Sequence, residues 1–269
     1  MSSLLITNLV YRKGIKMKII IAPAKIMKID RDSFPVQSKP EFLTKTRILE
    51  HFLKSRTKEQ LDTLWHASQK VTEQGILQLK NMDLDDRLTP AILAFSGIQY
   101  QYMAPDIFTQ PALDYIQKNL RILSGFYGIL RPFDGVCPYR LELNTKMIGF
   151  RDYSLYHFWG DDIANSLFKE DDTVINLASK QYMRLIKPYL NEKRRMITID
   201  FQELKNGEWK TVGVHAKMAR GEMVRFMAEN QIKNPADLRD FHDFEFQFEP
   251  EVSSDDHYIF RTAFDFSQR

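Results

Sequence analysis

The chain has 269 residues, of which 43% are apolar and 27% are charged, and its formal net charge is +3. This composition supplies a large packed core and excludes a disordered chain, while the small net charge is only weak support for a polyanionic partner. The single cysteine, Cys137, excludes a disulfide within the chain and a cysteine-built metal site. It favours a cytoplasmic protein with a buried thiol, and we predict neither a metal nor a cofactor.

The first sixteen residues contain an apolar patch that basic residues follow instead of preceding, which is the wrong order for a secretory signal. The patch is also too short to span a bilayer, so we expect no membrane contact. We predict that residues 1–16 form a disordered extension and that residues 17–269 form a single domain.

The continuous apolar run at residues 19–22 predicts a strand buried on both faces. Lys25 lies just beyond the carboxyl end of this strand, where ligands gather in open α/β sheets. It is a candidate anion contact, and a solvated loop lysine is the alternative. Apolar residues at helical spacing predict two or three helices over residues 40–80, a helix or strand over 90–95, and a short helix over 111–119.

The segment from residue 121 to residue 143 combines three glycines and two prolines with charged residues, and four of these lie close together after the second glycine: Arg131, Asp134, Arg140 and Glu142. Residues 121–124 are predicted to form a strand that enters a turn at Gly125. The prolines and the Asp134–Gly135 turn stiffen the loop that follows. Either the two arginines pair with the two carboxylates to lock this loop, or they face a ligand; both interpretations stay open.

The aromatic residues 156–159 are interpreted as a wedge in the core ahead of a helix that begins near Asp161, with base stacking as the alternative. Residues 173–177 are predicted to form a strand, and residues 180–187 a helix. Ser179 and Lys180 stand at the start of this helix, whose free N–H groups suit a phosphate. The alternative is that Ser179 simply caps the helix.

Residues 195–204 and 208–216 alternate like strands on either side of Asn206–Gly207, a strong hairpin signal. A helix follows over residues 217–230 with Lys217, Arg220 and Arg225, and Asn234 and its following proline begin a second helix. Regularly spaced phenylalanines beyond residue 240 predict edge strands with one apolar face.

The run SGFYGILRPFDGVCPYRLEL, residues 124–143, resembles the hallmark segment of the YaaA peroxide-stress family. Further matching pieces occur in the same order at residues 20–25, 94–97, 156–161, 176–179 and 217–221, so that the resemblance extends from residue 17 to about residue 265. It implies a role in limiting oxidative damage, by protecting DNA or by lowering available iron. It also implies a helix–hairpin–helix element, which would lie within residues 217–242.

Basic residues exceed acidic ones between residues 180 and 225, whereas the tail beyond residue 234 is acidic. This segregation is typical of a groove for a polyanion with an acidic back. We therefore predict an α/β fold, a single compact domain with a mixed sheet surrounded by helices and a cationic cleft that binds duplex or branched DNA with little sequence specificity. The predicted phosphate contacts are Lys25, Arg131, Arg140, Lys180, Lys217, Arg220 and Arg225.

The alternative function is an enzyme that acts on a nucleotide or a phosphorylated small molecule in the same cleft. The candidate catalytic residues are Lys25, Asp134, Glu142, Ser179 and Lys217. No Walker loop, dinucleotide fingerprint, nucleophile elbow or zinc spacing occurs in the sequence, which favours binding over catalysis.

Overall fold

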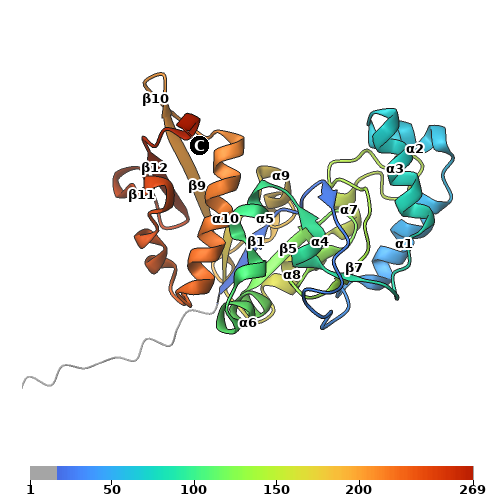
Figure 1. Ribbon diagram of the computed structural model, residues 1–269, viewed down its shortest axis with the longest axis horizontal. Coiled ribbons are helices and arrows are strands. Elements are labelled where there is room, and N and C mark those ends of the chain that lie inside the picture. The colour runs from blue at the N-terminus through green and yellow to red at the C-terminus, as the bar shows by residue number, and fades with distance from the viewer. Residues whose placement is uncertain (1–16, 269) are drawn as a thin grey trace, which may run out of the picture.

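A computed structural model describes residues 17–268 and contains an eight-stranded mixed sheet with the order β11-β12-β9-β8-β1-β5-β6, to which β10 adds beside β9 (Figure 1). The strands β1, β5, β8, β9 and β12 are mutually parallel, whereas β6, β10 and β11 are antiparallel to their neighbours. The predicted α/β class with a mixed sheet is confirmed. The strand bounds are β1 Met17–Ile21, β5 Leu120–Ser124, β6 Gly128–Leu130, β8 Thr173–Leu177, β9 Arg195–Lys205, β10 Glu208–Lys210, β11 Gln247–Phe248 and β12 His257–Thr262.

The two strands in the middle of the sheet, β1 and β8, are buried along their whole length. Ile19 pairs with Leu120 of β5 on one side and with Ile175 of β8 on the other. Strands covered on both faces need apolar side chains at successive positions, which is why a continuous apolar run predicted β1. Both predicted strands are confirmed.

Chain direction places the ends of three strands at one edge. From β1 the chain reaches β5 on one side, and from β6 it returns to β8 on the other side of β1. The loops after β1 and β8 therefore leave the sheet in opposite senses, which defines a topological switch point, the usual place for a ligand in open α/β sheets. We call the carboxyl ends of β1, β5 and β8, with the loops that follow them, the switch-point edge.

Ten α-helices are found in residues 17–268, together with short 3₁₀-helices. The α-helix bounds are α1 Leu43–Lys54, α2 Lys58–Trp65, α3 Gln69–Lys80, α4 Ala91–Ala94, α5 Ile98–Met103, α6 Gln110–Asn119, α7 Leu155–Trp159, α8 Asp162–Leu167, α9 Lys180–Met183 and α10 Gly213–Glu229. The 3₁₀-helices are η1 Pro105–Ile107, η2 Lys187–Tyr189, η3 Pro235–Asp240, η4 Asp243–Glu245, η5 Pro250–Val252 and η6 Phe266–Gln268. Two further strand pairs join β2 Ile26–Met27 to β4 Phe95–Ser96, and β3 Thr89–Pro90 to β7 Gly135–Val136.

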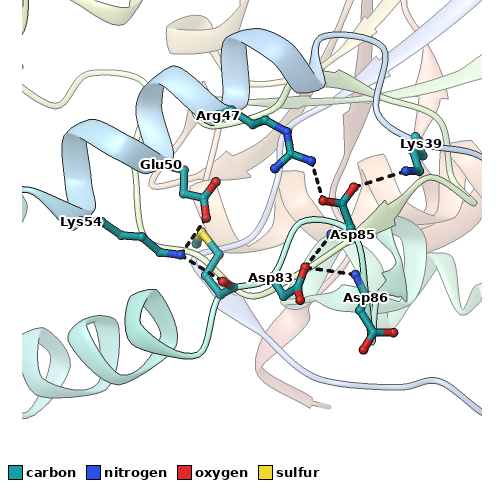
Figure 2. A network of polar contacts seen from close by, with 8 residues as sticks. Lys39, Arg47, Glu50, Lys54, Asp83, Asp85 and Asp86 are labelled. Atoms are coloured by element: carbon teal, nitrogen blue, oxygen red, sulfur yellow. Dashed lines mark hydrogen bonds and ion pairs between the residues drawn. The ribbon is translucent and has the colours of Figure 1, made fainter.

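The helices α1, α2 and α3 lie together at one end of the molecule, far from the strands β9 to β12 (Figure 1). They confirm the helices predicted over residues 40–80. Figure 2 shows how α1 is attached to the loop that follows α3: Arg47 and Lys39 both contact Asp85, at 2.6 and 3.2 Å. Lys54 bonds Glu50 at 2.7 Å and the carbonyl of Met82 at 3.1 Å. Each cation of this α1 charge network therefore faces a carboxylate.

Two predicted segments end or begin elsewhere. The strand predicted over residues 208–216 stops at Lys210, and α10 begins at Gly213 instead of residue 217. Val212 and Val214 alternate with other residues as in a strand. The chain forms a helix instead, because Ala216, Ala219 and Met223 are spaced to form one apolar helical face that is buried in the core. The helix predicted over residues 180–187 consists of the four-residue α9 followed by the 3₁₀-helix η2.

The segment after α10 also differs from the prediction. Asn234 does begin a helical turn, and its side chain accepts a bond from the N–H of Ala236, but the turn is the 3₁₀-helix η3. A helix–hairpin–helix is therefore not confirmed. The phenylalanines of the tail surround Phe201 of β9 instead of forming only edge strands, and β12 lies inside the sheet between β11 and β9.

Candidate functional site at the switch-point edge

The turn after β5 is built around Ser124. Its hydroxyl accepts hydrogen bonds from the N–H groups of Phe126 and Tyr127, at 3.1 and 2.9 Å, and shares a third, at 2.7 Å, with the hydroxyl of Tyr139. All these groups are buried. The turn that the sequence predicted at this point is therefore fixed by one hydroxyl, and it also holds the returning residues 139–143 at the switch-point edge.

Gly125 lets the backbone of residues 141–143 pack directly against the turn after β5. A Cβ atom there would lie 2.8 Å from the carbonyl oxygen of Leu141 and 2.9 Å from the nitrogen of Leu143, both backbone atoms. Trp159 donates from its indole nitrogen to the Gly125 carbonyl at 3.0 Å and is fully buried. The aromatic residues 158 and 159 thus form the predicted core wedge, which is bonded to the turn at the end of β5.

Lys25 and Glu142 meet at this edge. Lys25 follows β1, and its ammonium lies 2.9 Å from the Glu142 carboxylate, although the lysine side chain is 72% exposed. Tyr182 of α9 is buried beside the same carboxylate; burial above all, with the negative charges of neighbouring groups, raises the pKa of its phenol well above the ordinary value. Loops from three distant parts of the chain are therefore assembled here around one ion pair and a neutral phenol.

Arg140 has no ion-pair partner within residues 17–268. Its Nε is buried and forms no hydrogen bond, although it follows Tyr139 directly and lies two positions before Glu142. Glu142 contacts Lys25 instead. One interpretation of the central segment paired Arg140 with Glu142. In the structure Glu142 pairs with Lys25, so Arg140 has no counter-ion among the described residues.

Arg131 and Asp134 lie at the opposite edge. Because β6 runs antiparallel to β5 and Leu130 pairs with Ile122, Arg131 falls beyond the amino-terminal half of β5. The Asp134 carboxylate accepts bonds from the Ser38 hydroxyl at 2.6 Å and from the Arg131 N–H at 2.8 Å. Burial raises the pKa of Asp134 despite these bonds. Both residues hold the loop between β6 and β7, away from Lys25 and Glu142.

The helices α5 and α10 close the switch-point edge on one face of the sheet. The Tyr100 hydroxyl donates to the carbonyl of Ala22 at 2.9 Å, so the start of α5 is bonded to the loop that carries Lys25. A Cβ atom on Gly221 of α10 would lie only 2.3 Å from the carbonyl oxygen of Gln99, so the two helices are in backbone contact. Figure 1 shows them side by side in front of β1.

Two polar atoms at this helix contact have no hydrogen-bond partner within residues 17–268. The Nε of Arg220 and the Nε2 of Gln99 are buried and form no hydrogen bond. Burial lowers the pKa of Arg220, and the negative charge of Asp200 only partly opposes this effect. Thr198 and Asn176 form the last residue pair between β9 and β8. Asp200, two residues further along β9, therefore lies beside the loop that follows β8, and the Arg220 guanidinium is near Asp200.

The other predicted residues of α10 differ from Arg220. Lys217 is exposed one turn before Gly221 on the same side of the helix. Arg225 is occupied by Glu229, at 2.9 Å. Sequence reasoning missed Gln99 and Tyr182, because neither an amide nor a phenol inside a short helix carries a signal that distinguishes it from ordinary core.

Basic residues dominate the surface that leads away from β8. Ser179 precedes α9, but its side chain makes no capping bond, and Lys180 is exposed. Between residues 180 and 195 six basic residues accompany one acidic residue. No carboxylate within residues 17–268 forms an ion pair with Lys180, Arg184, Lys187, Lys193, Arg194 or Arg195. We call these six side chains the basic strip.

The sequence of the YaaA family, described as peroxide stress protein YaaA, matches residues 17–252. A UPF0246 protein of Lactobacillus acidophilus is 86% identical over 252 residues, which cover 94% of this chain and all of the relative. A UPF0246 protein of Lactobacillus johnsonii is 56% identical over 245 residues, 91% of this chain and 97% of the relative. The chain belongs to the YaaA peroxide stress family. The resemblance found in the central segment is therefore confirmed, and the disordered extension predicted for residues 1–16 lies outside the described residues.

The cationic cleft expected for this YaaA-family chain is not confirmed. A hollow of about 730 Å³ lies between α3 and residues 27–31, and a second of about 300 Å³ lies between α2 and residues 148–149. Neither is lined by Lys25, Arg140 or Arg220. Cys137 borders the larger hollow as a buried thiol that contacts the Tyr127 hydroxyl at 3.3 Å, and burial raises its pKa.

Residues 17–268 contain no group of three or more histidine, cysteine, aspartate or glutamate residues placed to hold a metal ion. In the same residues, no helix combines the length and apolar character that crossing a bilayer requires.

Proposed function

We propose that this YaaA-family protein acts in the peroxide stress response by binding nucleic acid in the cytoplasm, with the basic strip as its main contact to backbone phosphates. The observation that carries the proposal is the absence of carboxylate partners for these six side chains within residues 17–268, where cations elsewhere on the surface are often paired. Unpaired exposed cations attract a polyanion without first having to release an internal partner.

The strip is contiguous with the switch-point edge. Lys180 and Arg184 are exposed on either side of buried Tyr182, so α9 turns its phenol toward Glu142 and its cations outward. Arg184 lies over the ring of Tyr156, with 4.4 Å between its guanidinium carbon and the ring centroid. An arginine stacked on an aromatic ring loses less freedom when it contacts a phosphate, which supports a binding role for this end of the strip.

The opposite charge of the C-terminal segment supports the same function. Beyond residue 234 nine acidic residues accompany three basic ones. An uneven charge distribution of this kind orients an approaching polyanion before contact, and the boundary between the two signs lies where Arg195 bonds the Asp255 carbonyl at 3.4 Å. Contacts of this kind are made to phosphates and not to base edges, so we expect little sequence preference. Covering DNA in this way would shield it during peroxide stress.

Salt-dependent binding tests the proposal directly. Fluorescence anisotropy with a labelled duplex and a branched DNA should show affinity that falls steeply with salt. The triple variant Lys180→Glu, Arg184→Glu and Lys187→Glu should bind roughly 100-fold more weakly at about 0.1 M salt, with a shallower slope, because each phosphate contact contributes about 0.9 to that slope.

A matched control separates local contact from total charge. Lys58→Glu, Lys70→Glu and Lys80→Glu change the net charge by the same amount on the exposed surface of α2 and α3. This variant should bind nearly as well as the wild type. Equal losses in the two triple variants would show that only net charge matters, and an unchanged affinity in the first variant would overturn the proposal.

A further inference from the structure

Three buried nitrogen atoms at the switch-point edge have no hydrogen-bond acceptor within residues 17–268: Arg140 Nε, Arg220 Nε and Gln99 Nε2. Gln99 is 6% exposed, and neither guanidinium group forms an ion pair. A buried donor without a partner destabilises the folded protein, and a desolvated cation without a counter-ion does so more strongly. All three groups lack a hydrogen-bond acceptor, and the two guanidinium groups also lack a counter-ion, so an anion with several acceptor oxygens would satisfy them together.

Neighbours of the three donors connect them to one loop, residues 22–25. On one side, Glu142 contacts Lys25, and Tyr139, which precedes Arg140, packs against Phe95 just before α5. On the other side, Tyr100, adjacent to Gln99, bonds the Ala22 carbonyl. The contact of Gly221 with Gln99 then places α10, and with it Arg220, next to α5. Arg140 and Arg220 therefore belong to two segments that both connect to the loop after β1, one through Glu142 and the other through α5.

Little in the surroundings competes with an anion. Burial keeps the phenols of Tyr100, Tyr139 and Tyr182 protonated by raising the pKa of each, so they add no negative charge. Glu142 is engaged by Lys25, and Asp200 is held by His257 at 3.1 Å. The groups at this edge that lack a partner are therefore hydrogen-bond donors and cations.

We propose that the switch-point edge binds the phosphate group of a small phosphomonoester between Arg140 and Arg220, with Gln99 as a neutral donor and Lys25 at the entrance. A phosphomonoester dianion offers three terminal oxygens and the charge that two guanidinium groups match, and arginine forks bind such groups in pairs of hydrogen bonds. The buried position of these donors distinguishes the site from the exposed basic strip, so the inference does not depend on nucleic-acid binding.

Inorganic phosphate is the probe. Its binding should appear as a saturable rise in the thermal unfolding midpoint, measured at constant ionic strength with sodium chloride as the balancing salt, and as heat in a calorimetric titration. Arg140→Met and Arg220→Met should each weaken phosphate binding at least tenfold. Neither variant should lower the midpoint without phosphate, because each removes a buried Nε–H donor that has no acceptor and replaces it with an apolar chain of similar length.

Two controls separate this site from other cations. Arg131→Met removes an unpaired arginine at the opposite edge and should keep the full phosphate response. The triple reversal of Lys180, Arg184 and Lys187 should also keep it while losing duplex binding, so failure of one proposal is distinguishable from failure of the other. Adenosine monophosphate compared with a duplex that ends in a 5′-phosphate then distinguishes a small ligand from a nucleic-acid terminus.

The outcomes divide cleanly. A phosphate response lost in both methionine variants and kept in both controls supports the site. A response that the wild type shows equally with chloride, or that persists in either Arg140→Met or Arg220→Met, means an adventitious ion only and overturns it. A fall in the phosphate-free midpoint of both variants would assign the arginines to structure and would also overturn it.

Discussion

The α1 charge network and the switch-point edge use the same residue types in opposite ways. In the network of Figure 2, Lys39 and Arg47 share Asp85, and Lys54 contacts Glu50. At the switch-point edge, Arg140 and Arg220 are half-buried and so less exposed than those cations, yet neither forms an ion pair within residues 17–268, and the Nε of each is buried without an acceptor. Compensated cations attach one element to another, whereas buried uncompensated ones leave a free-energy cost that an external anion can offset. The comparison distinguishes structural charges from candidate binding charges.

A buried but compensated pair gives the largest expected effect. Lys18 lies 2.7 Å from Asp171, with side chains only 8% and 6% exposed; the angle is not that of a hydrogen bond, so the contact is an ion pair. Asp171→Asn should lower the free energy of unfolding by about 3 kcal/mol, since it leaves a buried ammonium without its partner. Urea denaturation measures this. A change as small as that of an exposed pair would show that the buried charge is not desolvated.

The contact of α10 with α5 positions Arg220 and gives the next effect. Gly221→Ala would put a Cβ atom 2.3 Å from the Gln99 carbonyl, so α10 must move, at a cost of up to about 3 kcal/mol. The phosphate response should weaken with it. Gly213→Ala is the control, because a Cβ atom there meets nothing within 4 Å. Equal stability of the two variants would contradict the close packing.

Removing compensation from the α1 charge network should have a much smaller effect. Asp85→Asn takes the carboxylate from both Lys39 and Arg47, but all three side chains are exposed. Water and salt already screen such pairs. The unfolding midpoint should stay close to the wild type, and the small loss should vanish in high salt. A loss comparable to that of Asp171→Asn would contradict this assignment.

The smallest expected effect depends on pH. Burial raises the pKa of Asp134 above its ordinary 3.8, so as pH rises from that value the unfolded chain ionises first and the wild type loses stability. Asp134→Asn cannot ionise. The variant loses some free energy of unfolding at every pH, because its bonds to Ser38 and Arg131 are weaker. Its free energy of unfolding relative to the wild type should nevertheless rise between pH 4 and pH 7, by roughly a fraction of a kcal/mol. A difference that stays constant with pH would show that Asp134 has no raised pKa.

Sequence patterns predicted the parts of the fold that follow from local rules. A continuous apolar run identified β1, helical spacing identified α1 to α3, and glycine with serine identified the turn at the end of β5; β8 and α6 were also predicted close to their observed bounds. The patterns failed where two periods overlap, as at residues 211–216, where a helix begins directly after a hairpin. They also overestimated the regularity of the last thirty residues, whose phenylalanines pack around Phe201 from several short turns.

The candidate site was predicted only in part, because a sequence shows which residues are charged but not which partner each one meets. Lys25 and Arg140 were singled out from the sequence. That Lys25 pairs with Glu142 and that Arg131 lies at the opposite edge depend on distances between segments remote along the chain. Arg225 pairs with Glu229 one turn further along α10.

Taken alone, the amino-acid sequence determined the buried strands, the turn chemistry of the central segment and the family, because these follow from the order of side chains within short windows. Tertiary structure decided the strand order, the switch point and the compensation of each charge. Burial and ion pairing are properties of surroundings assembled from the whole chain: Arg140 and Arg220 become candidate ligand contacts only because folding buries the Nε of each without an acceptor and leaves neither in an ion pair among residues 17–268.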